Sequence, residues 1–211
     1  MNGVLRRTAY SLLQSKGDLE AERAVHLYQL AGCHMDAIDV LCKQLAPHII
    51  PSQRNSLTAF GVGASGTKTA GPTQREFWLQ SSEAFITSFL SSKEAVSASI
   101  VRNLTKTPTA GHTISGIALA ETLQTLTALA HAVDHFMAGD MSTVLEILDA
   151  VPLKFLPQTE DQVSTAVAVT SHAHYSIKVV LDDTILIAMR SIRSLYEKTR
   201  TQQQQSNTAG S

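Results

Sequence analysis

Apolar residues recur every three or four positions along most of the chain, which is the period of an amphipathic helix. Two such runs lie near the N-terminus, at about 19–30 and 37–45, and Gly32 separates them. We expect Pro47 to end the second run, because proline lacks a backbone donor and clashes with the preceding turn. The spacing therefore predicts a helical hairpin.

The same period predicts further helices at about 73–90, 93–104, 114–138, 141–150 and 160–198. The stretch 163-VSTAVAVT-170 alternates like a strand, but a spacing of about three and a half residues continues through it and favours a helix. Two long apolar faces are expected to pack on each other: Leu123, Leu126, Leu129, Val133 and Phe136 on one helix, and Ile177, Leu181, Ile185, Ala188 and Ile192 on the other.

Two segments lack this period. Residues 48–73 contain Pro51, Pro72, several glycines and many small polar residues, which is typical of a long flexible loop. The end of the chain, 201-TQQQQSNTAGS-211, is of low complexity, and disorder is expected for 199–211. The predicted organisation is one α-helical domain over 1–198 with the loop inside it, followed by a disordered tail.

Two stretches share one template and suggest an internal repeat: 31-AGCHMDAIDVL-41 and 138-AGDMSTVLEIL-148. In each, an apolar helix precedes the glycine, which is expected to adopt a left-handed conformation and end that helix. Stacked units of this kind form α-solenoids. A common hairpin type that arose twice would give the same pattern, so both origins stay open. The fold class predicted is all-α, a solenoid-like stack of antiparallel helices.

Composition excludes several kinds of protein. The chain has 211 residues, is 44% hydrophobic and carries a net charge of −1, so it has no basic excess for nucleic acid or anionic membranes. Its two cysteines, Cys33 and Cys42, cannot form a disulfide framework, which fits a reducing compartment. The sequence predicts neither a signal peptide nor a transmembrane segment.

A glycine pattern at 61-GVGASGTKT-69 matches the dinucleotide fingerprint through Gly61, Gly63 and Gly66. That fingerprint functions only between a strand and a helix. Here the flanking residues predict neither element, and Thr67 separates Gly66 from Lys68, so the phosphate-loop pattern also fails. We therefore expect no nucleotide cofactor.

Four histidines and a cysteine are candidates for metal binding or catalysis. His131 and His135 are four residues apart, as in zinc-binding helices, but Ala132 occupies the place of a catalytic glutamate and no third ligand follows. His172 and His174 are two apart and would diverge on a helix. Cys33 has no basic residue in its local sequence to activate it. We expect no catalytic residue and no metal site.

Two further clusters have simple structural explanations. The cationic residues Arg190, Arg193, Lys198 and Arg200 would lie at the negative end of the last helix, and contact with an acidic partner is the alternative. Trp78, Phe77, Phe85 and Phe89 are expected in the core, although an exposed aromatic ridge would suit peptide docking.

The blocks 24-AVHLYQLAGCHMDAIDVLCKQLAPHI-49, 123-LQTLTALAHAVDHFMAGDMSTVLEILDAVPLKFLPQ-158 and 181-LDDTILIAMRSIRSLYEK-198 together carry a family resemblance. The chain resembles the C-terminal helical region of the nucleoporin-interacting component family, the linker nucleoporins of the nuclear pore's inner ring. Members are much longer, with an N-terminal coiled coil that this sequence lacks, and the glycine-rich loop is a further departure.

The resemblance implies a structural scaffold of the nuclear pore complex that supports nucleocytoplasmic transport of protein and mRNA at the nuclear envelope. It implies other inner-ring nucleoporins as partners, through linker segments, with no direct nucleic-acid contact, no small-molecule ligand and no catalysis. A helical-repeat adaptor of the tetratricopeptide or coatomer type, binding peptides in protein or vesicle traffic, is the alternative. An enzyme is the third.

Overall fold

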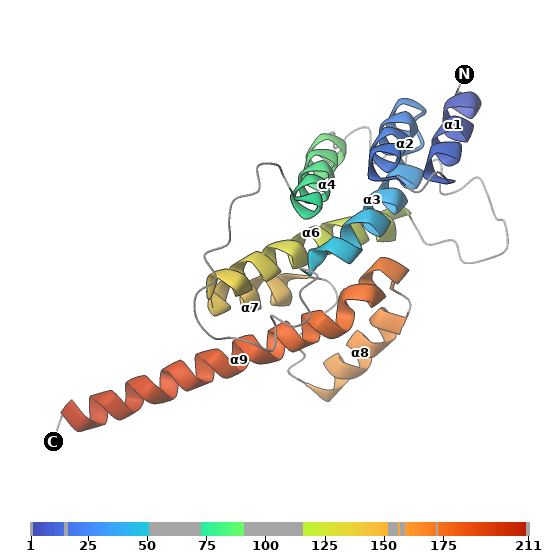
Figure 1. The fold of residues 1–211 in the computed structure, drawn as a ribbon. Coiled ribbons are helices and arrows are strands. Elements are labelled where there is room, and N and C mark those ends of the chain that lie inside the picture. The colour runs from blue at the N-terminus through green and yellow to red at the C-terminus, as the bar shows by residue number, and fades with distance from the viewer. Residues whose placement is uncertain are drawn as a thin grey trace. The chain divides into compact units, whose positions relative to one another are not determined.

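The computed structural model describes residues 2–14, 17–50, 73–90, 116–151, 156, 159–171 and 173–209 (Figure 1). Within these ranges every regular element is an α-helix, so the prediction of an all-α fold is confirmed. The chain forms two compact units, Met1–Gln124 and Thr125–Ser211, which are described separately below. A single domain over 1–198 stays a prediction.

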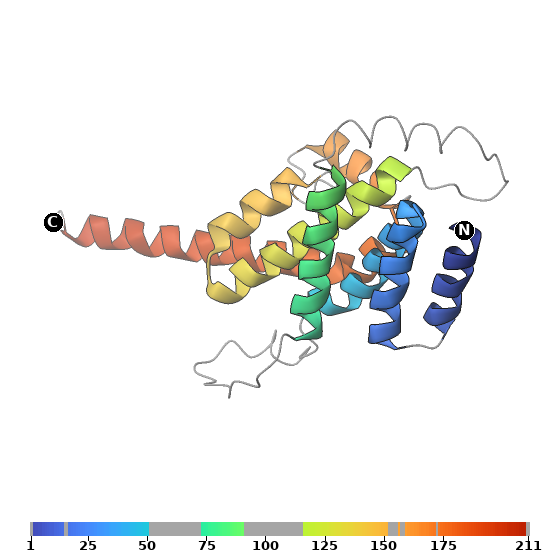
Figure 2. The ribbon, with the colours of Figure 1, turned by 90° about the horizontal axis from the view of Figure 1, so that it is seen from above.

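The first unit contains α1 (Asn2–Gln14), α2 (Asp18–Leu30), α3 (His34–Ile49) and α4 (Gln74–Leu90). Each helix packs on the next one in the chain: α1 on α2, α2 on α3 and α3 on α4. Figures 1 and 2 both show α1 and α2 side by side. Such neighbour-to-neighbour packing is typical of a solenoid-like stack.

The second unit contains most of α6 (Gly116–Ala138), with α7 (Met141–Ala150), α8 (Glu160–Ser171) and α9 (Tyr175–Ala209). Helix α6 buries one broad face that includes Leu126, Leu129 and Val133, whereas Gln124 and Asp134 are exposed. Helix α7 packs on α9, and the Ser191 hydroxyl lies 3.5 Å from the Met141 sulfur across that contact.

Helix α2 ends in a Schellman turn. Gly32 has a φ of 68°, its N–H donates to the Gln29 carbonyl at 3.0 Å, and the Cys33 N–H donates to the Tyr28 carbonyl at 2.8 Å. These two bonds satisfy carbonyls that the end of a helix would otherwise leave unpaired. Helix α3 begins at the next residue, so Cys33 also serves as its N-cap.

Helix α6 ends in the same way. Gly139 has a φ of 81°, its N–H donates to the Phe136 carbonyl at 3.1 Å, and the Asp140 N–H donates to the His135 carbonyl at 2.9 Å. Asp140 is then the N-cap of α7 and accepts a hydrogen bond from the Thr143 N–H. The left-handed glycines expected from the shared template are therefore confirmed, and repeat ancestry stays a prediction.

Large side chains fill the first unit. Trp78 is 1% exposed and packs edge-on against Phe77, with ring centroids 5.0 Å apart. Helix α3 contributes an almost continuous buried face: Ala37, Ile38, Leu41, Cys42, Leu45 and Ile49. The expectation that Trp78 and Phe85 belong to the core is confirmed, and the side chain of Phe89 lies outside the described residues.

The end of α3 differs from the prediction. Pro47 lies inside the helix, which continues to Ile49. A proline this close to the C-terminus removes one backbone hydrogen bond and leaves the following residues free to keep helical dihedrals. The terminal carbonyl of Ile49 accepts a hydrogen bond from the Arg75 guanidinium at 3.2 Å, which ties the start of α4 to the end of α3.

Helix α4 begins with a capping box. The Thr73 hydroxyl accepts from the Glu76 N–H at 3.3 Å, and the Glu76 carboxylate accepts from the Thr73 N–H at 2.8 Å. This reciprocal pair satisfies two backbone donors at the helix start. The flexible loop predicted for 48–73 is therefore shorter than expected, because its first residues belong to α3 and Thr73 caps α4. Its interior, 51–72, lies outside the described residues.

The single helix predicted over 160–198 is wrong, because α8 ends at Ser171 and α9 begins at Tyr175. Polar contacts stabilise this corner without glycine or proline. The Lys178 ammonium donates to the Ser171 carbonyl at 2.8 Å, and His174 Nδ1 accepts from the Ser176 N–H at 3.2 Å. Both helix ends thus find hydrogen-bond partners within the corner.

The buried face of α9 also differs from the predicted face. Ile177 and Ala188 are buried as expected, whereas Ile185 and Ile192 are exposed. The face directed at the core consists of Ser176, Ile177, Val180, Thr184, Ile187, Ala188 and Ser191. The predicted packing of Leu123–Phe136 against this helix stays a prediction.

The disordered tail predicted for 199–211 is corrected for residues 199–209, which are the last turns of α9. Glutamine is a good helix former, and Gln202–Gln205 extend a helix that is already nucleated. Arg190, Arg193, Lys198 and Arg200 therefore lie well before the helix end, and the macrodipole explanation for them fails. Arg193 instead pairs with Glu197 at 2.8 Å.

The helix predicted at 93–104 falls in a range that the structure does not describe.

Candidate partner-binding groove

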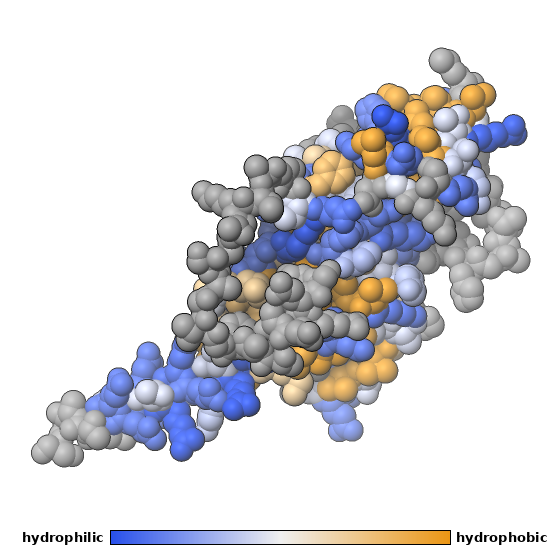
Figure 3. Space-filling view, in the orientation of Figure 1, coloured by the Kyte–Doolittle hydropathy of each residue, from blue (hydrophilic) through white to orange (hydrophobic). Residues whose placement is uncertain are grey.

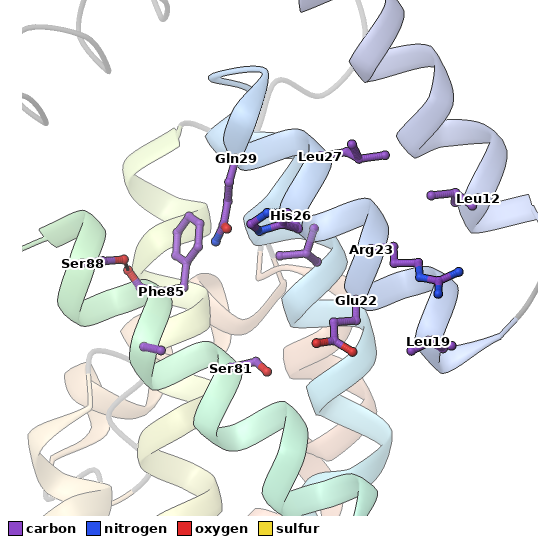
Figure 4. Close-up of a pocket in the computed structure, with 12 residues that line it drawn as sticks. Leu12, Leu19, Glu22, Arg23, His26, Leu27, Gln29, Ser81, Phe85 and Ser88 are labelled. Atoms are coloured by element: carbon purple, nitrogen blue, oxygen red, sulfur yellow. Dashed lines mark hydrogen bonds between the residues drawn. The ribbon is translucent and has the colours of Figure 1, made fainter.

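A groove opens on the surface of the first unit between α2 and α4, with one edge of α1 beside it (Figure 4). Its volume is about 800 Å³, which falls in the range of ligand- and peptide-binding clefts. The lining side chains are Leu12, Leu19, Glu22, Arg23, Val25, His26, Leu27, Gln29, Ser81, Ala84, Phe85 and Ser88. We call this surface the α2–α4 groove.

The helical period explains why these residues share one surface. Glu22, His26 and Gln29 follow each other at spacings of four and three on α2, and Ser81, Phe85 and Ser88 do so on α4. In Figure 4 the Phe85 ring projects from α4 toward His26 and Gln29 of α2. The groove is therefore lined by two facing helical stripes.

Phe85 forms a rigid wall of the groove. It is 4% exposed, and the His34 ring lies against it with centroids 6.5 Å apart. Burial lowers the pKa of His34, which keeps this imidazole neutral near pH 7. The His34 ring at the start of α3 thus packs against this aromatic wall.

The rim of the groove is polar, whereas its floor is apolar. Glu22, Arg23 and His26 are exposed, and Val25 is buried below them. Figure 3 shows hydrophobic residues gathered over the end of the unit that carries α1 and α2. Apolar pockets with a polar rim are typical of protein–protein contacts.

The predicted histidine pair, His131 and His135, lies on one side of α6. His131 and His135 are both half-buried on α6, and His135 Nδ1 lies 3.4 Å from the Asp140 carboxylate. Hydrogen bonds from Thr143 and Ser142 lower the pKa of Asp140 to about 2. Among the residues that the structure describes, no three His, Cys, Asp or Glu side chains come together as a metal site would require.

The two cysteines carry free thiols. Cys42 is completely buried in α3, and burial raises the pKa of its thiol, so it stays protonated and unreactive. Cys33 occupies the turn between α2 and α3, as predicted. His174 is buried and caps α9, while His172 and the glycine pattern at Gly61, Gly63 and Gly66 lie outside the described residues.

The groove was not predicted from the sequence, although one signal for it was present. Leu19 and Leu27 lie outside the apolar stripe that α2 buries, so α2 carries apolar residues on a second side. The sequence could not predict that the stripe on α4 faces α2, because no pattern in the sequence indicates that these two helices are neighbours.

The fold and this groove define a class of protein. Helices that pack on their neighbours in sequence order characterise solenoid-like helical proteins. None of the described helices is both long enough and apolar enough to cross a bilayer.

The chain belongs to the Nup93/Nic96 family, whose model matches residues 6–211. This is a family of inner-ring nucleoporins, so the chain is a nucleoporin of the nuclear pore complex at the nuclear envelope, and its family associates with other nucleoporins. A comparison with curated proteins gives no significant match.

Proposed function

We propose that this protein is a non-catalytic scaffold of the nuclear pore complex that holds other inner-ring nucleoporins through their linker segments. The observation that carries the proposal is the family match over almost the whole chain. The α2–α4 groove supports it, because a scaffold needs a preformed surface on which an extended segment can dock.

The groove favours a short hydrophobic segment as its occupant. Phe85 and Val25 offer buried apolar contact, and Leu19 and Leu27 add apolar lining on the side of α2 toward α1 (Figure 4). Most binding energy in such contacts comes from a few buried anchors. Since Glu22 and Arg23 on the rim carry opposite charges, the affinity should depend only weakly on salt.

A matched pair of variants on α4 tests the groove. Ala84 lines the groove, whereas Thr87 is exposed on the same helix outside it. Ala84→Arg should weaken binding of an inner-ring nucleoporin linker by about tenfold or more, because the new side chain fills the groove. Thr87→Arg should leave binding unchanged, and titration calorimetry with linker peptides measures both.

One result would contradict docking in the groove, and another would contradict the scaffold role itself. If Ala84→Arg and Thr87→Arg bind equally well, the linker does not dock in this groove, and the scaffold proposal needs another surface. If the tagged wild-type protein spreads evenly through the cytosol and captures no nucleoporin, the scaffold proposal falls and the helical-repeat adaptor replaces it.

A further inference from the structure

Helix α9 exposes a broad apolar stripe along the side opposite its buried face. The exposed members include Met189, which is 64% exposed, and Tyr196, which is 67% exposed. The whole stripe consists of Tyr175, Val179, Ile185, Leu186, Met189, Ile192 and Tyr196. Apolar residues gathered in this way on one helix mark an interaction surface.

The centre of the stripe has the spacing of a coiled-coil seam. Ile185, Met189, Ile192 and Tyr196 are separated by four, three and four residues. This alternation places all four on one line of a helix, where they can insert between the side chains of a second helix. The natural occupant of the stripe is therefore another helix with an equivalent seam.

The charges at the two ends of the seam are complementary to each other. Asp182 lies three residues before Ile185, and Arg200 lies four residues after Tyr196. If two α9 helices pair in antiparallel orientation, Ile185 of each copy faces Tyr196 of the other, and Asp182 comes beside Arg200 of the second copy. A parallel pair would bring Asp182 against Asp182, which is repulsive.

We propose that two copies of this chain associate in antiparallel orientation along α9, through the seam formed by Ile185, Met189, Ile192 and Tyr196. The second copy fits better than an unrelated helix, because a single sequence supplies both the apolar layers and the opposite charges at their ends. The buried face of α9 packs on α7, whereas the stripe is exposed within the part of the chain that the structure describes.

The length of the seam sets the strength of the dimer. From Asp182 to Arg200 an α-helix rises about 27 Å, and four large residues per copy cover this distance. Four residues per copy are few beside the roughly 20–30 residues that each partner of a stable complex usually contributes. The dimer should therefore dissociate in the micromolar range.

Sedimentation of the full chain over a range of concentrations tests the association. The wild type should shift from monomer to dimer within the micromolar range, and Met189→Asp should raise the dissociation constant by about tenfold or more. Val167→Asp is the matched control, because Val167 is an equally exposed apolar residue on α8 and should leave the dimer intact. A wild-type monomer at every concentration, or equal loss in both variants, would overturn the proposal.

Disulfide trapping tests the orientation independently of affinity. In a Cys33→Ser background, chains with Asp182→Cys mixed with chains with Arg200→Cys should form mixed disulfide dimers. Asp182→Cys alone should not cross-link, because the two new thiols lie at opposite ends of an antiparallel pair. Rapid cross-linking of Asp182→Cys alone would show a parallel pair and refute the proposed arrangement.

Discussion

Replacing Gly139 with alanine isolates the energetic effect of one backbone conformation. An added Cβ would meet no heavy atom within 4 Å at Gly139, and the same is true at Gly32. Substitution therefore creates no clash with neighbouring side chains. The remaining cost is that of holding an L-residue at a φ of 81° or 68°.

The expected magnitude follows from that strain. A left-handed conformation costs a residue with a Cβ about 1–2 kcal/mol, and valine, which is β-branched, should lie at the upper end of this range. Asparagine tolerates the conformation better, so stability should decrease in the order Gly, Asn, Ala, Val at both positions. For a chain of this size, about 1–2 kcal/mol corresponds to a fall in melting midpoint of about 2–8 °C.

Thermal and urea unfolding of the variants, followed by far-ultraviolet circular dichroism, measures this series. Gly3→Ala is the control, because Gly3 lies in helix α1, also has no heavy atom near an added Cβ, and has no positive φ. There alanine should be neutral or stabilise by up to about 1 kcal/mol. Valine variants as stable as the wild type at both turn positions would refute the assignment of left-handed caps.

Two further predictions concern polar groups. The pKa of Asp140 is lowered from 3.8 to about 2, so the hydrogen bonds that its carboxylate accepts stabilise the fold above about pH 4. This contribution is lost as the pH falls toward about 2, and Asp140→Asn should remove that loss from melting curves recorded over this interval. The Ser82 hydroxyl is buried and has no hydrogen-bond partner among the described residues, so Ser82→Ala should raise the free energy of unfolding by about 1 kcal/mol or more. Ser88→Ala, which removes an exposed hydroxyl bonded to the Phe85 carbonyl, should not, and denaturant titration compares the two.

Local sequence signals predicted the helix ends that depend on local chemistry. Gly32 and Gly139 end their helices where expected because a left-handed residue is needed at the turn itself, and glycine is the residue that adopts it most readily. Helix α7 was predicted with the right bounds for the same reason, since it begins directly after Gly139 and Asp140.

Ends that depend on distant or solvent-exposed contacts could not be predicted. The corner between α8 and α9 relies on Lys178 reaching back seven residues to the Ser171 carbonyl, and the apolar spacing continues across it without interruption. Pro47 was assigned as a helix end because its clash with the preceding turn is a general rule, yet the contact of Arg75 with Ile49 stabilises the turn beyond it.

The candidate groove could not be predicted from the sequence for a related reason. Phe85 was correctly assigned to the core, but its role as a wall depends on His34 and on the position of α4 beside α2. These relations join residues that are about fifty positions apart in the sequence. Periodicity describes each helix by itself and says nothing about which stripe faces which.

The two Schellman turns leave no spare residue between the helices they join. Cys33 and Asp140 each close one helix and open the next, so the chain turns without any linker to absorb a change in length. One residue inserted into the first turn of α3 or α7 would rotate every later side chain of that helix by about 100°, because an α-helix has 3.6 residues per turn. Side chains of that helix that are now buried would then turn toward solvent, and exposed ones would turn toward the core. These corners should therefore tolerate substitution far better than insertion or deletion.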